Sequence, residues 1–159
     1  TVCLPLINLL FPEAKIIFTH RNPFDTVLSC FQQSFEPNNS MANFVSLKSS
    51  AQVYDLTMQM WLLYEKNLRL DFVTSRYEAL LENFDNHVNM ILDFLGLEWD
   101  ENIKNYRNTA LNRGKINTPS SSQVVQPLYK TSVAKWKNYE KYFSDSKIYL
   151  EKWSRYFGY

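Results

Sequence analysis

Arg21 and Ser29 are the residues whose types and spacing first point to chemistry. Arg21 lies in the charged turn that follows a short apolar run, and Ser29 comes eight positions later. Between them, Asn22 suits the N-cap of a helix, Pro23 suits its first position, and Asp25 adds an acid to the first turn. An arginine beside a helix N-terminus favours an anion, phosphate above all. The pattern therefore predicts an anion site at a strand-to-helix turn; the alternative is an arginine that only pairs with a nearby carboxylate.

Two strands must position these side chains. Residues 16–18 are β-branched or aromatic and predict a first strand directly before Arg21, and LDFVT at 70–74 predicts a second. Ligands dock at the carboxyl ends of strands in open α/β sheets. Tyr77 lies just past the second strand, so its ring or hydroxyl could reach the same ligand as Arg21. The alternative is that Tyr77 packs on the sheet edge with its hydroxyl in water.

Helical patterns fill much of the remaining chain. The apolar opening TVCLPLINLLF predicts a core helix, and Gly96 suits the C-cap of an amphipathic helix at 84–95. Asp100 suits the cap of a short helix that runs through Tyr106. Further helices are predicted at 23–35, 46–68, 75–83, 132–139 and 144–156. The apolar face of the 46–68 helix is predicted from helical spacing to be Val53, Leu56, Met60, Leu63 and Tyr64.

The segment from Leu111 to about Thr131 has no helical or strand pattern. It contains Gly114, Pro119, Pro127 and three consecutive serines. A loop of this length in a compact domain is usually functional or disordered. Composition alone would make it a linker.

Composition excludes several classes of function. In 159 residues, a 45% hydrophobic and 16% aromatic content predicts a packed core, and a net charge of +1 disfavours broad binding to nucleic acid. With 3 glycines the chain has no glycine-rich phosphate loop, and no apolar run is long enough to span a membrane. Cys3 and Cys30 are interpreted as buried, reduced thiols, and two isolated histidines disfavour a zinc site.

The motif RNPxDxxLS after AKIIF resembles the 3′-phosphate-binding motif of the sulfotransferase superfamily. Those enzymes transfer a sulfuryl group from 3′-phosphoadenosine 5′-phosphosulfate (PAPS). The resemblance implies that Arg21 and Ser29 bind the 3′-phosphate. RYEALLENF is similar to the family's YE-D/Q-L segment, which implies that Tyr77 contacts adenine or phosphate. Glu78 is expected to pair with Arg21 or Arg76.

The segment TPSSSQVVQPLYKTSVAKW resembles the part that closes over the nucleotide in tyrosylprotein sulfotransferases and in bacterial sulfotransferases fused to tetratricopeptide repeats. The resemblance implies that Ser120 stabilises the transition state and that Lys135 approaches a phosphate. It also implies that the loop from Ser120 to Val125 lies against PAPS, the sulfuryl donor, with contacts from Ser121, Ser122, Gln123 and Val124.

The resemblance implies a P-loop-NTPase-like parallel sheet flanked by helices, truncated at its N-terminus. The family's first strand and its PKSGTT-like 5′-phosphosulfate loop are absent from these residues, and the catalytic base is expected upstream of Thr1. Residues 1–159 are thus expected to be the C-terminal portion of a single sulfotransferase domain. NRGK at 112–115 replaces the RKGxxG loop of small-molecule sulfotransferases, which disfavours that branch.

The same resemblance implies a hydroxyl-bearing acceptor, a peptide tyrosine or a sugar, with no metal ion. It implies a bacterial cytoplasmic protein whose full length could include upstream tetratricopeptide repeats. Two alternatives stay open. A P-loop kinase or nucleoside-triphosphatase fragment would need Mg²⁺ ligands and a GxxxxGK[ST] loop, which the sequence lacks. A non-catalytic helical module would use the aromatic residues from Trp136 to Phe157 to bind a protein partner.

Overall fold

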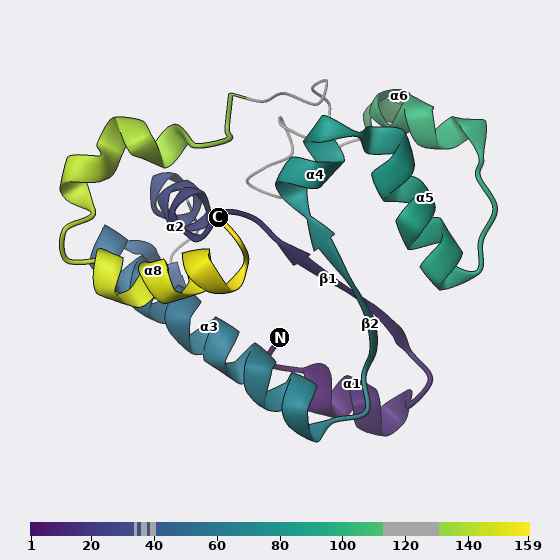
Figure 1. Cartoon of the computed structure of the whole chain (residues 1–159), viewed down its shortest axis with the longest axis horizontal. Helices are drawn as coiled ribbons and strands as arrows, with labels where there is room; N and C mark the ends of the chain where they lie inside the picture. The colour runs from purple at the N-terminus through teal and green to yellow at the C-terminus, as the bar shows by residue number, and fades with distance from the viewer. Residues whose placement is uncertain (34, 36–37, 39–40, 113–130) are drawn as a thin grey trace.

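The computed structural model of the chain describes residues 1–33, 35, 38, 41–112 and 131–159. In these residues, strands β1 (Lys15–His20) and β2 (Asp71–Arg76) form a parallel pair, in register from Lys15 opposite Asp71 to His20 opposite Arg76. Both strands therefore end at the same edge (Figure 1). The helices are α1 (Leu4–Leu10), α2 (Pro23–Gln32), η1 (Met41–Phe44), α3 (Leu47–Asn67), α4 (Tyr77–Glu82), α5 (Phe84–Leu95), η2 (Glu101–Asn105), α6 (Tyr106–Asn112), η3 (Lys135–Tyr142) and α8 (Lys147–Tyr156).

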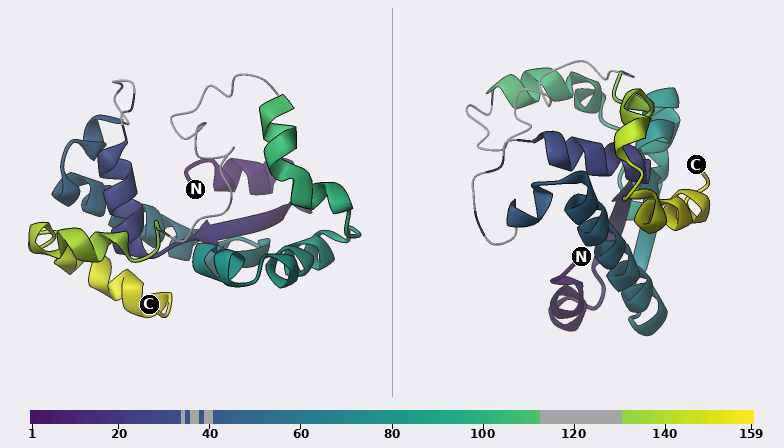
Figure 2. Two further views of the ribbon diagram at one scale, coloured as in Figure 1. Left: turned by 90° about the horizontal axis from the view of Figure 1, so that it is seen from above. Right: turned by 90° about the vertical axis from the view of Figure 1, so that its left-hand side faces the viewer.

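Helices lie on both sides of the strand pair. Figures 1 and 2 show α2, α3, η3 and α8 gathered on one side and α4, α5 and α6 on the other. The described residues thus form a mixed α/β fold, in which helices flank a two-stranded parallel sheet. None of the described helices combines the length and the apolar character that a membrane span requires.

Two clusters of buried side chains hold the strand-to-helix turn in place. One joins α2, α3 and α8, and its buried members are Phe24, Val27, Leu28, Ala51, Phe143 and Leu150. The other joins β1 to α3 and α8, and its buried members are Leu4, Phe18, Met58, Trp61 and Trp153. Because Phe18 and Phe24 belong to different clusters, the residues between them are fixed at both ends.

The predicted helix caps are confirmed. The Asn22 side chain accepts hydrogen bonds from the backbone N–H groups of Phe24 and Asp25, at 3.0 and 3.3 Å. Asp100 accepts from the N–H of Asn102 at 2.7 Å. Gly96 ends α5 with φ of 72°, a left-handed conformation that glycine adopts without strain.

The opening helix forms, but its expected place in the core is wrong. Within α1 only Leu4 is buried, whereas Leu6, Leu9 and Leu10 are 55%, 76% and 61% exposed. Nearly every position in this segment is apolar, so hydrophobicity alone cannot show how much of the helix is covered. The burial expected for Cys3 is also wrong: Cys3, directly before this helix, is exposed. Cys30 is half-buried, and burial raises the pKa of its thiol.

The predicted core face of the long helix is right only in part: Tyr64 packs against a buried cluster, and Val53 and Met60 are half-buried. Leu56 and Leu63 are exposed, and the buried residues of α3 are Ser50, Ala51, Asp55, Met58 and Trp61. Polar residues can lie on this face because their hydrogen bonds are made locally or by a neighbouring helix. The Ser50 hydroxyl donates to the carbonyl of Ser46 at 2.7 Å, and Asp55 accepts from the indole N–H of Trp153, also at 2.7 Å.

The C-terminal aromatic residues mostly pack inside the molecule. Phe143 is fully buried and Trp153 is 4% exposed, while Tyr142 and Tyr156 are exposed. Core packing is therefore confirmed for much of this stretch, which weakens the case for an aromatic partner surface. The predicted helix at 132–139 begins later, at Lys135, and is a 3₁₀ helix that runs to Tyr142.

Candidate functional site

A cavity lies where the two strands end, beside α2, α3 and residues 131–135. It has a volume of about 1010 Å³. Its lining includes four of the residues singled out by the sequence: Arg21, Ser29, Tyr77 and Lys135. Arg21 and Tyr77 meet there because β1 and β2 are parallel and adjacent, so that both strands deliver the next residues to one edge.

Arg21 has hydrogen-bonding capacity left over in this cavity. One guanidinium nitrogen donates to the backbone carbonyl of Ser132. The guanidinium carbon lies 5.1 Å from the ring centroid of Tyr77, which places the cation over the aromatic face. Among the described residues, the buried Nε of Arg21 finds no hydrogen-bond partner. Buried polar groups are nearly always satisfied, so this donor is one that the described part of the chain leaves without an acceptor.

Tyr77 is held in place by the same segment. Its hydroxyl is 3.0 Å from the hydroxyl of Ser132. The contact uses only part of the hydrogen-bonding capacity of the phenolic hydroxyl, so the expected contact of Tyr77 with a ligand stays a prediction. The ring remains on the cavity lining beside Arg21.

Ser29 and Lys135 lie at the exposed rim of the cavity. Ser29 is two helical turns beyond the start of α2, on the cavity side of that helix. The Lys135 ammonium donates to the side-chain oxygen of Gln32 at 2.9 Å. Because Lys135 is exposed and its stem is flexible, the ammonium can turn toward an anion in the cavity. The remaining candidates, Ser120, Ser121, Ser122, Gln123 and Val124, lie outside the described residues.

The N-terminus of α2 is already capped by the protein. Asn22 occupies the N–H groups of Phe24 and Asp25, so these donors are not directed at the cavity. An anion beside this turn must then be bound chiefly by side chains, with Arg21 first among them.

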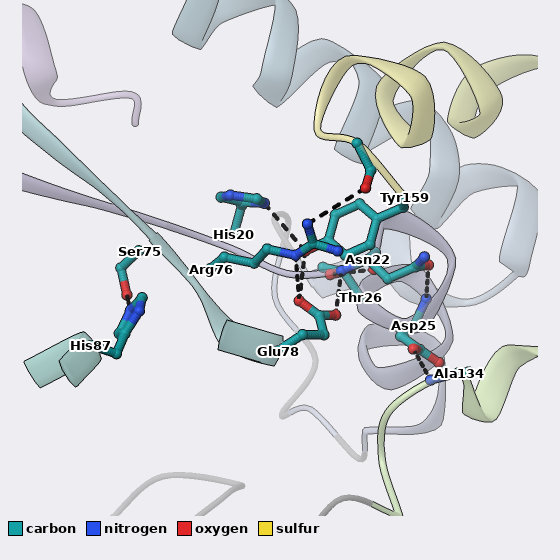
Figure 3. A network of polar contacts seen from close by, with 11 residues as sticks. His20, Asn22, Asp25, Thr26, Ser75, Arg76, Glu78, His87, Ala134 and Tyr159 are labelled. Atoms are coloured by element: carbon teal, nitrogen blue, oxygen red, sulfur yellow. Dashed lines mark hydrogen bonds and ion pairs between the residues drawn. The ribbon is translucent and has the colours of Figure 1, made fainter. Parts of the chain in front are cut away.

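Sequence reasoning missed how far Glu78 anchors the turn. Of the two partners expected for Glu78, Arg76 is the one that pairs with it, and the Arg76 Nε lies 3.7 Å from a Glu78 carboxylate oxygen. Glu78 also accepts from the backbone N–H of Asn22 at 3.0 Å and from the hydroxyl of Tyr159 at 2.6 Å (Figure 3). Glu78 thus ties the residue after Arg21 to α4. No local pattern shows a contact with a residue 81 positions away.

Sequence reasoning also missed the contacts of Asp25. Its carboxylate oxygens accept from the backbone N–H groups of Ala134 at 2.7 Å and Trp136 at 2.9 Å. Burial raises the pKa of the Asp25 carboxyl, although the two amides and the charge of Arg21 oppose that shift. In the sequence, Asp25 indicates only the first turn of a helix, and nothing near it predicts these distant contacts.

A match to a family model accompanies this geometry. The model, described as "Sulfotransferase family", matches residues 1–101, which include both strands, Arg21, Ser29 and Tyr77. The chain belongs to the sulfotransferase family. An "Uncharacterized protein" of Aquifex aeolicus (strain VF5) is 30% identical to it over 145 residues. The match covers 87% of the present chain but 18% of the relative, so this chain spans under a fifth of that protein's length.

Within the part of the chain that the structure describes, no group of three His, Cys, Asp or Glu side chains is placed to hold a metal ion. Charge at the cavity comes instead from Arg21 and Lys135, with Asp25 engaged by backbone amides.

A buried Ser75–His87 pair supports β2 from the side of α5. The Ser75 hydroxyl lies 2.9 Å from His87 Nε2, and the two residues are 7% and 9% exposed (Figure 3). Burial lowers the pKa of His87 below its ordinary value of 6.5. Burial therefore favours the neutral form of His87 in the folded chain.

We expect this pair to make stability depend on pH. Because the folded pKa of His87 is depressed, the unfolded chain takes up a proton more readily as pH falls below about 6.5, so the free energy of unfolding should decrease. The His87→Gln variant keeps a hydrogen-bonding group but cannot be protonated. Urea unfolding at pH 7.5 and 5.5 should show a smaller decrease for the variant. An equal decrease in both proteins would contradict the prediction, since every other titrating group is shared.

Proposed function

We propose that this chain carries the 3′-phosphate and adenosine half of the donor site of a sulfotransferase that uses PAPS. The reaction transfers a sulfuryl group to a hydroxyl acceptor, a peptide tyrosine or a sugar. The observation that supports the proposal best is that Arg21, whose buried Nε has no hydrogen-bond partner among the described residues, lines one cavity with Ser29, Tyr77 and Lys135. Phosphate oxygens would accept from the guanidinium of Arg21, and the cavity volume of about 1010 Å³ is in the range of small-molecule sites.

Each residue has a role that its chemistry suits. Arg21 would present its planar fork to two oxygens of the 3′-phosphate, held by the ring of Tyr77 beneath it. The Ser29 hydroxyl would donate to the same phosphate, since both residues line one cavity. The Tyr77 ring would also contact the adenosine. Lys135 would add positive charge from the rim.

The rest of the site belongs to the same proposal. PAPS, when bound, would supply the sulfuryl group: the acceptor oxygen would bond to sulfur in line with the bond that breaks, 3′-phosphoadenosine 5′-phosphate would leave, and the hydroxyl proton would pass to the proposed base. Such a displacement is helped mainly by positioning and by hydrogen-bond donors aimed at the oxygens. Ser120 would donate a hydrogen bond that strengthens in the transition state. Ser121, Ser122, Gln123 and Val124 would lie against the donor.

The broader expectations also remain proposals. One is that the sheet is P-loop-like. Another is that residues 1–159 form the C-terminal portion of one domain, with the 5′-phosphosulfate loop and the catalytic base elsewhere in a longer protein. They also include linked tetratricopeptide repeats and a bacterial cytoplasmic location.

Thermal unfolding with matched nucleotides tests the donor. The ligand is 3′-phosphoadenosine 5′-phosphate (PAP), and the control is AMP, which lacks only the 3′-phosphate. PAP at about 100 times its Kd should stabilise the chain by about 2.7 kcal/mol, which raises the Tm by about 5–10 °C. AMP at the same concentration should raise it much less.

Two outcomes would contradict the proposal. Equal shifts with PAP and AMP would mean that the 3′-phosphate is not recognised. A larger shift with Mg·ATP than with PAP would favour the kinase or nucleoside-triphosphatase alternative.

A further inference from the structure

Asp25 makes contacts that a first-turn acid of a helix does not need. The side chain is 1% exposed, and the N–H groups of its own helix end are capped by Asn22. The carboxylate instead contacts a segment more than a hundred residues away, accepting from Ala134 at 2.7 Å and from Trp136 at 2.9 Å. Figure 3 shows the Asp25 carboxylate directed at the backbone of Ala134.

The segment from Ser132 to Trp136 carries groups of the candidate site. Ser132 binds Arg21 through its carbonyl and Tyr77 through its hydroxyl, and Lys135 lines the cavity three residues later. Between them, Ala134 has φ of 56° and ψ of 20°. An alanine adopts this left-handed conformation only at a cost, so other contacts must hold it there. The two charge-assisted hydrogen bonds to Asp25 are such contacts.

We propose that Asp25 is a positioning residue for the nucleotide site. Its buried carboxylate fixes residues 132–136, so that Ser132 orients the guanidinium of Arg21 and Lys135 faces the cavity. This inference rests on the proposed function, because it assigns Asp25 to the recognition of the 3′-phosphate. Asp25 itself touches no reacting atom and acts through Ser132 and Arg21.

The Asp25→Asn variant is the sharpest test. Asparagine has the same shape but only one acceptor oxygen, so one of the two N–H groups loses its partner. Isothermal titration would give Kd values for PAP and AMP at a temperature where the variant is folded. We expect PAP binding to weaken about 5- to 30-fold and AMP binding to change less than about 3-fold. Unchanged discrimination between PAP and AMP in the folded variant would overturn the inference.

Asp55→Asn is the matched control for a purely structural effect. Asp55 is also buried and joins distant segments through Trp153 and Lys152, but it does not line the cavity. This variant should lose stability while its ratio of PAP to AMP affinity stays as in the wild type. Loss of discrimination in both variants would mean that destabilisation alone causes it, which would also overturn the inference.

Amide hydrogen exchange in the wild type needs no variant and no ligand. The N–H groups of Ala134 and Trp136 should be strongly protected in the free chain, since a buried carboxylate holds them. Rapid exchange at both amides would overturn the inference even if Asp25→Asn failed to fold. If the wild type binds PAP no better than AMP, the proposed function fails, whereas protected amides would still show that the tie to Asp25 exists.

Discussion

Replacing Arg21 with glutamine should weaken PAP binding by about 30- to 1000-fold. This range corresponds to about 2–4 kcal/mol for the loss of two charge-assisted hydrogen bonds to one phosphate. Arg21 is half-buried, lies over the ring of Tyr77 and donates to the carbonyl of Ser132, so its guanidinium is already held at the cavity. AMP binding should change little, because the lost contact is to the 3′-phosphate. Isothermal titration of the two nucleotides measures both effects.

Arg76→Gln is the matched control for Arg21→Gln. Arg76 lies at the end of the neighbouring strand, where it pairs with Glu78 and lies over the ring of Tyr159, and it does not line the cavity. Its variant should bind PAP within about 3-fold of the wild type, as expected for a change that removes no ligand contact. Equal losses in the two variants would mean that overall positive charge, and not Arg21, binds the nucleotide.

Replacing Trp61 with alanine should lower the free energy of unfolding by about 3–5 kcal/mol. The indole is 4% exposed, stacks on Phe18 with ring centroids 3.9 Å apart, and meets the ring of Phe72 edge-on at 5.1 Å. It therefore joins α3 to both strands. Urea unfolding followed by circular dichroism measures the change.

Leu63→Ala on the same helix is the control. The sequence pattern places Leu63 on the core face of this helix, but the structure leaves it 58% exposed. Its removal should change the free energy of unfolding by no more than about 0.5 kcal/mol. If Leu63→Ala cost as much as Trp61→Ala, the helix would be rotated relative to the structure, and the face predicted from the sequence would be right.

The face of α3 shows where pattern reasoning stops. The helix has apolar residues on more than one side, so helical spacing could not choose between Leu56 with Leu63 and Met58 with Trp61. Packing of the flat Trp61 ring on Phe18 decided the choice, and buried Asp55 is tolerated because Trp153 donates to it. A hydrophobicity pattern predicts that a helix face with an aspartate is exposed, so it gives the wrong result for the face that holds Asp55.

The candidate site was anticipated in part. Arg21, Ser29, Tyr77 and Lys135 were chosen from the sequence and the structure brings them to one cavity, although their binding roles stay predictions. Asp25, Glu78 and Ser132 were not chosen. Apart from the ion pair of Glu78 with Arg76, their contacts join residues 55 to 111 positions apart, for example Ser132 with Tyr77 and Asp25 with Trp136. Such contacts leave no periodic signal.

The sequence by itself determined the elements that depend on local interactions. The strand, the Asn22 cap and the helix after it, with Arg21 between them, follow from neighbours within a few residues, as does the left-handed Gly96. The tertiary structure decided which helix faces are buried, which carboxylates hold the turn, and how residues 132–136 meet Arg21 and Tyr77. The physical reason is that hydrophobic burial is non-directional, whereas these hydrogen bonds depend on the placement of segments far apart in the chain.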